Sequence, residues 1–478
     1  MHIEIEHEYK RQAIHVAIGM IVLAFPFLSV GSLVLLSLIL FIFILLLPRS
    51  SKLFKVMTYR SGAAARRPTG AISLSGSMLI LLLAAWLLSF TPYSLPIFVI
   101  GGAIAITTFG DGFATILRVS DQAKCMALDK IKCPARVYSD ASGARVKTES
   151  VKVSLTLFFV GTLFSFIVGC WITHWTEPVS FELLFFISVI GALTGALLEC
   201  ISTRIHDNIT VPIGSAMVMW LFLTFGYSVP YLHVALALTF ALVLGYLAYA
   251  AGIADVSGLI SATLVGVLII VFTNIWWFLL LLAFYLLGGG FTKYKYKYKQ
   301  SLGIAQGKGG ARGYKNVFSN SIVAIAASVA YPMFPQSASI ILYTYMGSVA
   351  TATGDTLASE IGTTHKGSPR MITTLKKVDP GTDGGVSSLG EIAATAGSFA
   401  IALLALLFGV IEIKTGSNWL LGILIVTISG FVGTNIDSLL GATMQQRGIL
   451  SNNGVNVVST ILGGAVAGAL WMAAVGIC

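Results

Sequence analysis

Long apolar stretches recur along the whole chain, and they limit the folds available to it more than any other feature. About fifteen of them have roughly the 17 to 25 residues that an α-helix needs to cross a lipid bilayer. Of the 478 residues, 56% are hydrophobic and only 10% are charged, which is outside the range of soluble domains. The sequence therefore predicts an all-α polytopic integral membrane protein.

The predicted spans follow one another with mostly short connections. They are residues 12–29, 31–48, 72–90, 95–117, 152–173, 180–203, 211–227, 229–252, 256–273, 274–290, 318–334, 338–361, 390–413, 416–441 and 454–476. With this threading, the 30 lysines and arginines lie almost entirely on one side, and Lys414 is the exception in a loop on the other face. Because basic loops tend to stay inside, the N-terminus and this side are predicted to be cytoplasmic, in a prokaryotic cell membrane.

The chain is predicted to consist of two membrane domains, residues 1–228 and 229–478, separated at a short Pro-containing turn. In each half a Gly-Asp pair closes a helix and a long cytoplasmic loop follows. A second aspartate then comes near the cytoplasmic end of a later helix. The spacing of the two aspartates differs between the halves, so the similarity is one of organisation and does not establish a duplication.

An aspartate stands near the end of an apolar run in each half, Asp111 in FGDGFATIL and Asp355 in TGDTLASEI. At the centre of a membrane helix an aspartate costs roughly 2.5 to 3.5 kcal/mol, so it usually faces a cavity or a partner. The alternative is a helix-end residue that reaches the interface. Glu360 lies within a turn and a half of Asp355 and could share a cation with it, and such oxygen ligands suit Mg²⁺. The predicted catalytic residues are Asp111, Glu199, Asp207, Asp355, Glu360 and Asp437, and all except Glu199 are also predicted metal ligands.

A glycine-rich bend follows two lysines in KKVDPGTDGGVSSLGE, residues 376–391, and opens a helix. Free backbone N–H groups at a helix start, beside glycines and cations, form a cradle for phosphate. The alternative is that the glycines only turn the chain. The predicted phosphate-binding residues of this segment are Lys377, Gly381, Thr382, Asp383, Gly384, Gly385 and Ser387.

Basic loops offer further phosphate contacts. In GGGFTKYKYKYKQSLGIAQGKGGARGYKN, the KYKYKYK part is predicted to anchor a helix at the membrane surface. Lys308 and Arg312 lie deeper in this loop and are predicted to bind phosphate, with anchoring as the alternative. In GARVKTESVKVS, Lys147 and Thr148 are candidates, and a solvated basic loop is the alternative. The remaining predicted nucleotide-binding residues are Arg118, Asn208 and Asn435.

Two further positions admit a functional and a structural interpretation. Arg11 and His15 in RQAIHVAIG share one face of the first predicted helix with Gly19, because the three are four residues apart. Arg11 and His15 are predicted to contact the substrate, although a histidine at such a place can equally be a hydrogen-bonded packing residue. Asn208 could cap the start of a helix instead of binding nucleotide.

These motifs resemble two enzyme families. In the first half, RQAIHVAIG, FGDGFATIL, VKTESVKVS and LECISTRIHDNITVP resemble the phytol and dolichol kinase family, integral membrane enzymes that phosphorylate a long isoprenoid alcohol, typically with CTP. The second half, from about Ala235, is similar to the phytyl phosphate kinase family through GGGFTKYKYK, GARGYKNVFSN, TATGDTLASEIG, VDPGTDGGVSSLGE and GTNIDSLLGA. The second resemblance implies conversion of a monophosphate to a diphosphate.

Together the resemblances predict a bifunctional prenol kinase that uses CTP or another nucleoside triphosphate with Mg²⁺. Its partners would be an isoprenoid alcohol of the phytol or geranylgeraniol type, the monophosphate and the nucleotide, but no nucleic acid. A prenyl tail, at about 0.8 kcal/mol per buried CH₂, keeps both lipids in the bilayer, so only the head group has to meet cytosolic nucleotide. The alternatives are a cytidylyltransferase that makes a CDP-lipid, and a membrane transporter.

Overall fold

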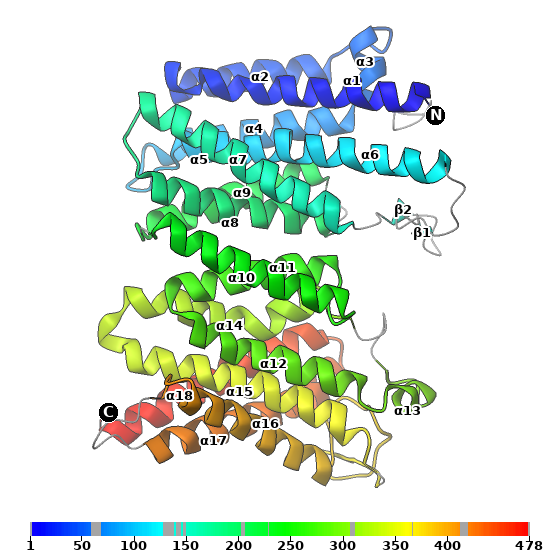
Figure 1. The fold of residues 1–478 in the computed structure, drawn as a ribbon, viewed down its shortest axis with the longest axis vertical. Helices are drawn as coiled ribbons and strands as arrows, with labels where there is room; N and C mark the ends of the chain where they lie inside the picture. Colours follow the sequence, from blue (N-terminus) through cyan, green and yellow to red (C-terminus); the bar gives the residue numbers. More distant parts are fainter. Residues whose placement is uncertain are drawn as a thin grey trace. The chain divides into compact units, whose positions relative to one another are not determined.

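The protein is almost entirely helical, with two short two-stranded antiparallel hairpins (Figure 1). The structure, a computed structural model, describes residues 2–58, 68–127, 138–139, 145–146, 150–201, 206–227, 229–305, 311–365, 367–411 and 419–476. The chain divides into two compact units, unit 1 (Met1–Ala235) and unit 2 (Leu236–Cys478). Helix α10 (Tyr231–Ala250) contains the point of division.

Unit 1 is a bundle in which α5 and α8 are the most deeply buried of the long apolar helices described. Its elements are α1 (His2–Gly19), η1 (Met20–Phe27), α2 (Val30–Leu45), α3 (Lys52–Thr58), α4 (Thr69–Leu88), α5 (Ile97–Ala105), η3 (Ile106–Gly110), α6 (Asp111–Ala127), β1 (Tyr138–Ser139), β2 (Arg145–Val146), α7 (Val151–Trp175), α8 (Phe181–Cys200) and α9 (Asp207–Thr224). Helix α7 packs against α5 and α8, α8 packs against α9, and α2 packs against α4.

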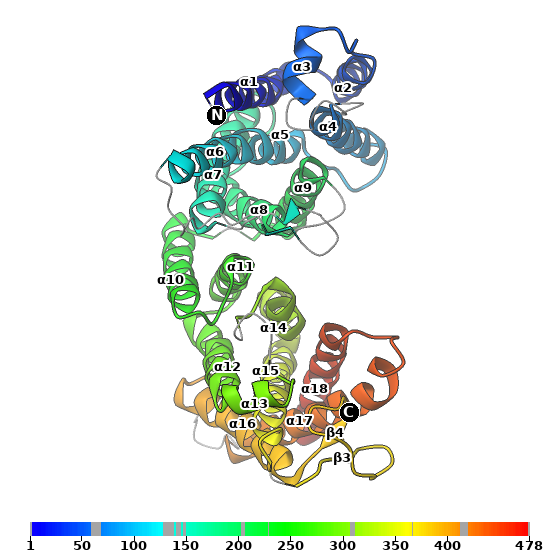
Figure 2. The same cartoon turned by 90° about the vertical axis from the view of Figure 1, so that its right-hand side faces the viewer.

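Unit 2 is built around one long helix, α15. Its elements after α10 are α11 (Val256–Phe272), α12 (Ile275–Lys293), α13 (Tyr296–Ser301), α14 (Tyr314–Met333), η5 (Pro335–Ser337), α15 (Ala338–Gly362), β3 (Arg370–Met371), β4 (Gly385–Val386), α16 (Ser388–Leu407), α17 (Trp419–Leu440), η6 (Gly441–Gln445) and α18 (Asn452–Val475). Figure 2 shows α15 among α12, α14, α16, α17 and α18, all of which pack against it.

Small side chains let neighbouring helices approach α15 closely. Between Gly347 and Gly354 every residue of α15 is buried, and all eight are Gly, Ala, Ser, Thr or Val with little bulk. A Cβ placed on Gly354 would lie 2.7 Å from Thr434 Oγ1 and 2.8 Å from Ser398 Oγ, on α17 and α16. Helix association in membranes depends on such close packing of small residues. The residue before Asp355 is therefore a glycine for a packing reason.

Side chains cap several helices at the places where the apolar runs begin. Ser29, Ser180, Ser387 and Ser451 accept a hydrogen bond from the backbone N–H three residues later, at the starts of α2, α8, α16 and α18. Such caps satisfy N–H groups that have no partner inside the helix. The local sequence therefore sets where these helices start.

Every predicted span falls on a helical segment, which confirms the helical part of the prediction. Among the residues that the structure describes, nine helices are long and apolar enough to cross a membrane, and α2 and α11 are shorter apolar helices. The number of fifteen spans and the cytoplasmic N-terminus stay predictions. The end of the fourth predicted span differs: helical structure runs from α5 through η3 into α6 as far as Ala127, so Asp111 lies inside a continuous helical segment and does not close a helix.

Candidate functional site

In unit 1, six of the predicted site residues line one cavity of about 350 Å³, the unit 1 cavity. These are Arg11, His15, Asp111, Arg118, Asp207 and Asn208. They come from α1, α6 and α9, and residues at the start of α4 complete the wall. In Figure 1 the N-terminal end of α1 and the C-terminal end of α6 point to the same end of the unit. The cavity therefore joins polar side chains that are almost two hundred residues apart.

Arg118 is the central cation of the unit 1 cavity. Its Nη2 donates to Glu199 Oε1 at 2.5 Å, and the Glu199 side chain is only 5% exposed. The guanidinium also interacts electrostatically with Asp111 and Asp207. Glu199 itself does not line the cavity. It holds the Arg118 side chain in place, and the Arg118 charge acts on both Asp111 and Asp207.

A π-helical turn sets the position of Asp111. Residues Ile106–Gly110 form this turn directly before α6, and π-helical turns inside α-helices are frequent at functional sites. Gly110 packs on α7, because a Cβ there would lie 3.0 Å from the carbonyl oxygen of Leu157. Thr115 donates its hydroxyl to Asp111 Oδ1 at 3.3 Å. The aspartate is thus held inside a continuous helical segment, directly after the π-helical turn, where the sequence predicted a helix end.

His206, which was not predicted, takes the role of helix cap at α9. Its Nδ1 accepts a hydrogen bond from the backbone N–H of Asn208 at 3.3 Å. Asn208 is therefore not the cap; its Nδ2 donates to the carbonyl oxygen of Gly70 at 2.8 Å and ties α9 to the start of α4. A histidine directly before Asp-Asn was the available signal, but it carries no distinctive spacing.

In unit 2, nine of the predicted site residues line one cavity of about 440 Å³, the unit 2 cavity. These are Asp355, Glu360, Gly381, Thr382, Asp383, Gly384, Gly385, Ser387 and Asp437. They come from the C-terminal part of α15, the β3–β4 segment, the residue before α16 and the C-terminal part of α17. The two aspartates predicted for this half are thus brought to one place with the glycine-rich segment.

The carboxyl groups of Asp355 and Asp437 lie within hydrogen-bonding distance of each other. Ser459 of α18 donates its hydroxyl to Asp437 Oδ2 at 2.8 Å, which orients that group. Two carboxylates this close repel unless they share a proton or a cation. Their oxygens are the donors that Mg²⁺ prefers, and Mg²⁺ typically takes one or two carboxylates and completes its shell with phosphates and water. Over the described part of the chain no cluster of three or more His, Cys, Asp or Glu suited to a metal occurs.

Glu360 is engaged by protein groups on both oxygens. Its Oε2 accepts a hydrogen bond from Lys299 Nζ, and its Oε1 accepts one from Thr292 Oγ1 at 2.9 Å. Lys299 also donates to the carbonyl oxygens of Phe291 and Thr292 at 2.9 and 3.0 Å. The ion pair fixes the short helix α13 against α12 and α15. It gives Glu360 a partner other than the cation predicted to be shared with Asp355.

Lys299 corrects the interpretation of the KYKYKYK segment as a surface anchor. It is the last lysine of that segment, and only 3% of its side chain is exposed. A buried lysine requires an ionic or hydrogen-bonding partner, and Glu360 supplies it. Lys295 and Lys297 in the same segment are exposed.

The glycine-rich segment forms a hairpin that packs on the end of α17. Gly381 and Gly384 have φ of +85° and +79°, a region that other residues rarely adopt. The hairpin is held by Gln446, which donates to the carbonyl oxygen of Asp383 at 2.8 Å. Ser387 then caps α16, whose first backbone N–H groups stand at the edge of the cavity. A helix start of this kind favours a phosphate group.

Arg312 is a buried cation next to this site. Its side chain stacks on Phe284, with the guanidinium carbon 5.4 Å from the ring centroid, and it interacts electrostatically with Glu360. Burial lowers the pKa of the guanidinium. Its Nε and Nη1 make no hydrogen bond with any described residue. An arginine is rarely left so poorly paired, and an anion is the partner that its donors fit.

Two other described residues that were predicted to bind phosphate, Lys377 and Asn435, do not line the unit 2 cavity. Lys377 is exposed, and Asn435 donates to Glu391 Oε2 at 3.1 Å. Lys147, Thr148 and Lys308 lie outside the described residues. Glu391, a cavity residue at the first turn of α16, was not predicted.

Comparisons with known proteins cover the second half. A family model described as "Integral membrane protein DUF92" matches residues 239–464, which include every residue that lines the unit 2 cavity. No solved structure matches the chain. The match confirms the prediction of a multi-pass integral membrane protein.

Relatives come from several kinds of organism. An uncharacterized membrane protein of Synechocystis sp. is 35% identical over 187 residues, 39% of this chain and 70% of the relative. An uncharacterized membrane protein of Methanocaldococcus jannaschii is 32% identical over 213 residues, 44% of this chain and 83% of the relative. Protein VTE6, chloroplastic, of Arabidopsis thaliana is 29% identical over 196 residues, 40% of this chain and 57% of the relative. The predicted prokaryotic origin is not tested by this distribution.

Proposed function

This chain belongs to the integral membrane protein DUF92 family, and we propose that unit 2, which carries the match, phosphorylates a prenyl monophosphate to the diphosphate. Unit 1 makes the monophosphate from the isoprenoid alcohol. Both use CTP or another nucleoside triphosphate with Mg²⁺. The likeness to Protein VTE6 and the resemblance of the unit 2 motifs to phytyl phosphate kinases support a kinase of this kind.

The single observation that carries the proposal is the pairing of Asp355 with Asp437 beside the glycine-rich hairpin. Phosphoryl transfer depends mainly on positioning and on neutralising phosphate charge. Paired carboxylates hold the cation that neutralises this charge, and backbone N–H groups of a hairpin and a helix start hold phosphate oxygens. Both features meet in one cavity of unit 2.

In unit 2 the reaction needs no base for the acceptor. A deprotonated oxygen of the prenyl monophosphate forms a bond to the γ-phosphorus of the nucleoside triphosphate. The bond from that phosphorus to the β-phosphate oxygen breaks, and the nucleoside diphosphate leaves. Mg²⁺ held by Asp355 and Asp437 would neutralise the phosphate charge during this transfer. Arg312, which is buried and lies outside the cavity lining, would contribute positive charge near Glu360.

In unit 1 the acceptor is an alcohol, whose hydroxyl proton has to leave. Asp111 and Asp207 are the carboxylates of the unit 1 cavity that can accept this proton or hold a metal. Arg11 and Arg118 line the same cavity and supply positive charge for the phosphates of the nucleotide. The base contributes typically 10²- to 10⁴-fold to such a step.

Labelled CTP distinguishes the proposal from its alternatives. The full chain in lipid nanodiscs is given a prenol, Mg²⁺ and CTP labelled at either the α or the γ phosphate. We expect γ label in a prenyl monophosphate and then in the diphosphate. Transfer of the α label to the lipid would identify a cytidylyltransferase. If neither label is transferred, the result would favour the membrane transporter.

A further inference from the structure

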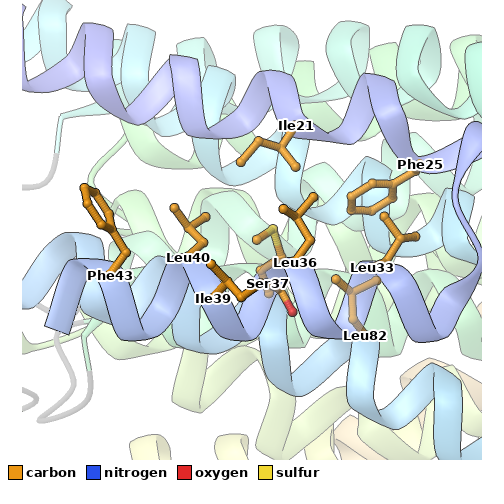
Figure 3. Close-up of a pocket in the computed structure, with 10 residues that line it drawn as sticks. Ile21, Phe25, Leu33, Leu36, Ser37, Ile39, Leu40, Phe43 and Leu82 are labelled. Atoms are coloured by element: carbon orange, nitrogen blue, oxygen red, sulfur yellow. The ribbon is translucent and has the colours of Figure 1, made fainter. Parts of the chain in front are cut away.

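An apolar groove lies in unit 1 between η1, α2 and α4 (Figure 3). Its volume is about 220 Å³, and nine of the ten residues that line it are hydrophobic. The tenth, Ser37, already donates its hydroxyl to the carbonyl oxygen of Val34 at 2.9 Å. The groove therefore suits a hydrocarbon chain and offers little to a polar ligand.

The residues that line the groove follow those that line the unit 1 cavity on two segments of the chain. Ile18 near the end of α1 lines the polar cavity and Ile21 in η1 lines the groove; on α4, Leu74 lines the cavity and Met78 lines the groove. One turn of α-helix rises about 5.4 Å. The apolar lining thus begins about one turn beyond the polar lining on both segments, and a molecule with a polar head and a long tail fits both.

The groove has a buried floor and an exposed rim. Leu33 and Met78 on the floor are 1% and 2% exposed, whereas Leu36 and Ile39 on the rim are 41% and 56% exposed. In a membrane bundle an exposed apolar rim faces lipid. A hydrocarbon chain can therefore enter from the side while its head group reaches the polar cavity.

Contacts on the opposite side of η1 keep the groove open. Trp171 of α7 donates its indole N–H to the carbonyl oxygen of Leu23 at 3.0 Å. The rings of Phe27 and Trp175 pack with their centroids 5.5 Å apart. Closing the groove would require η1 to move toward α2 and break these contacts.

We propose that this groove binds the prenyl chain of the alcohol whose hydroxyl lies in the unit 1 cavity, an inference that rests on the proposed function of unit 1. The groove then determines the preference for long alcohols. A chain too short to reach Ile21 leaves the groove empty, so its phosphorylation does not depend on the groove.

A matched pair of substitutions tests this. Leu36→Trp fills the groove, whereas Leu35→Trp makes the same change at a neighbouring α2 residue that is 59% exposed and does not line it. Full-length wild type and variants in nanodiscs are given a single-isoprene prenol or a prenol of several isoprene units. We expect Leu36→Trp to lower kcat/KM about ten- to a hundredfold for the long prenol only, and Leu35→Trp to have no such effect.

Equal losses for both prenols in Leu36→Trp, or equal losses in the two variants, would overturn the inference. If wild type phosphorylates neither prenol, the proposed function of unit 1 fails instead. A measurement on wild type does not depend on variant folding: a long prenol with a diazirine at its tail end is irradiated and the labelled peptides are mapped. We expect labelling of η1 and α2. Excess unlabelled prenol should abolish this labelling, whereas excess phospholipid should not. Equal competition by phospholipid would identify a general lipid groove and contradict the proposal.

Discussion

The cavities of the two units both contain acidic and basic side chains, but the ratio of acidic to basic side chains differs. Among the described residues that line them, the unit 2 cavity has five acidic side chains, Asp355, Glu360, Asp383, Glu391 and Asp437, and one basic side chain, Lys299. The unit 1 cavity has two acidic side chains, Asp111 and Asp207, and two arginines, Arg11 and Arg118. A phosphate group, if bound as proposed, would meet excess negative charge in unit 2 and balanced charge in unit 1. Under the proposed function, unit 2 would therefore depend on metal cations for positive charge, whereas unit 1 has two arginines.

In each unit, the described residues include an ion pair with little exposure beside the Gly-Asp motif. The helix that carries the motif supplies the cation of the pair in unit 1 and the carboxylate in unit 2. In unit 1 the cation, Arg118, is on the helix of Asp111 and its partner Glu199 is on another helix. In unit 2 the carboxylate, Glu360, is on the helix of Asp355 and its partner Lys299 is on α13. The two sites thus follow a similar plan without residue-by-residue equivalence.

The largest expected effect is on the alcohol step. Asp111→Asn removes a carboxylate that accepts a proton or holds a metal, so phosphorylation of prenol is expected to fall about 10²- to 10⁴-fold. Phosphorylation of added prenyl monophosphate is expected to stay at the wild-type rate, because the unit 2 cavity is unchanged. Both rates are measured by mass spectrometry of the lipid products. Asp121→Asn, on the same helix but outside the cavity, is the matched control. An equal loss of prenol phosphorylation in this variant would show that Asp111 has no specific role in the reaction.

The second effect is on the monophosphate step. Asp355→Asn weakens the paired carboxylates, and the diphosphate is expected to form about 10²- to 10³-fold more slowly while monophosphate accumulates. Product ratios over time give the measurement. Asp379→Asn changes an exposed residue of the same hairpin and is expected to behave as wild type. A variant that still makes diphosphate at the normal rate would show that the pair is not needed.

The buried ion pair of unit 2 can be tested through stability. Lys299→Met leaves Glu360 buried without its cation, and removing one partner of such a pair typically costs about 3 to 5 kcal/mol. Thermal unfolding in detergent is expected at a clearly lower Tm, whereas Lys297→Met, at an exposed lysine of the same segment, should change little. Equal Tm values for the two variants would mean that Lys299 is a surface anchor after all.

The two steps are also expected to differ modestly in the free Mg²⁺ that they require. Because excess negative charge attracts a cation, the unit 2 cavity is expected to bind Mg²⁺ more tightly than the unit 1 cavity with its two arginines. The monophosphate step is therefore expected to reach half its maximal rate at several-fold lower free Mg²⁺ than the alcohol step. Initial rates of both steps in one Mg²⁺ titration with chelator-buffered solutions provide the measurement. Identical midpoints would contradict the charge argument.

The sequence was informative where one residue type has few physical roles. Carboxylates such as Asp355 and Asp437 inside apolar runs have to meet a partner or a cavity, and the structure brings these two together. The burial of Lys299 could not be predicted, because in the alternating Lys-Tyr sequence this lysine cannot be distinguished from the exposed Lys295 and Lys297. Its burial depends on the chain reversal at Lys295, where φ is +49°, and on the distant Glu360.

Long-range packing accounts for the other features that the sequence did not reveal. His206 caps α9, and a single histidine before an aspartate has no periodicity to mark it. The apolar groove depends on η1, α2 and α4 meeting in space, and its leucines cannot be distinguished in sequence from those that face lipid. The π-helical turn before Asp111 is likewise set by packing of Gly110 on α7.

We propose that each unit has its own site for one of two consecutive phosphorylations, and complementation between two variants can show whether the sites work independently. Asp111→Asn and Asp355→Asn proteins are reconstituted separately and together in the same vesicles with prenol, CTP and Mg²⁺. We expect only traces of prenyl diphosphate from either variant alone and much faster formation by the mixture, because monophosphate made by one protein diffuses in the bilayer to the other. No diphosphate from the mixture, with each folded variant inactive toward both alcohol and monophosphate, would contradict it.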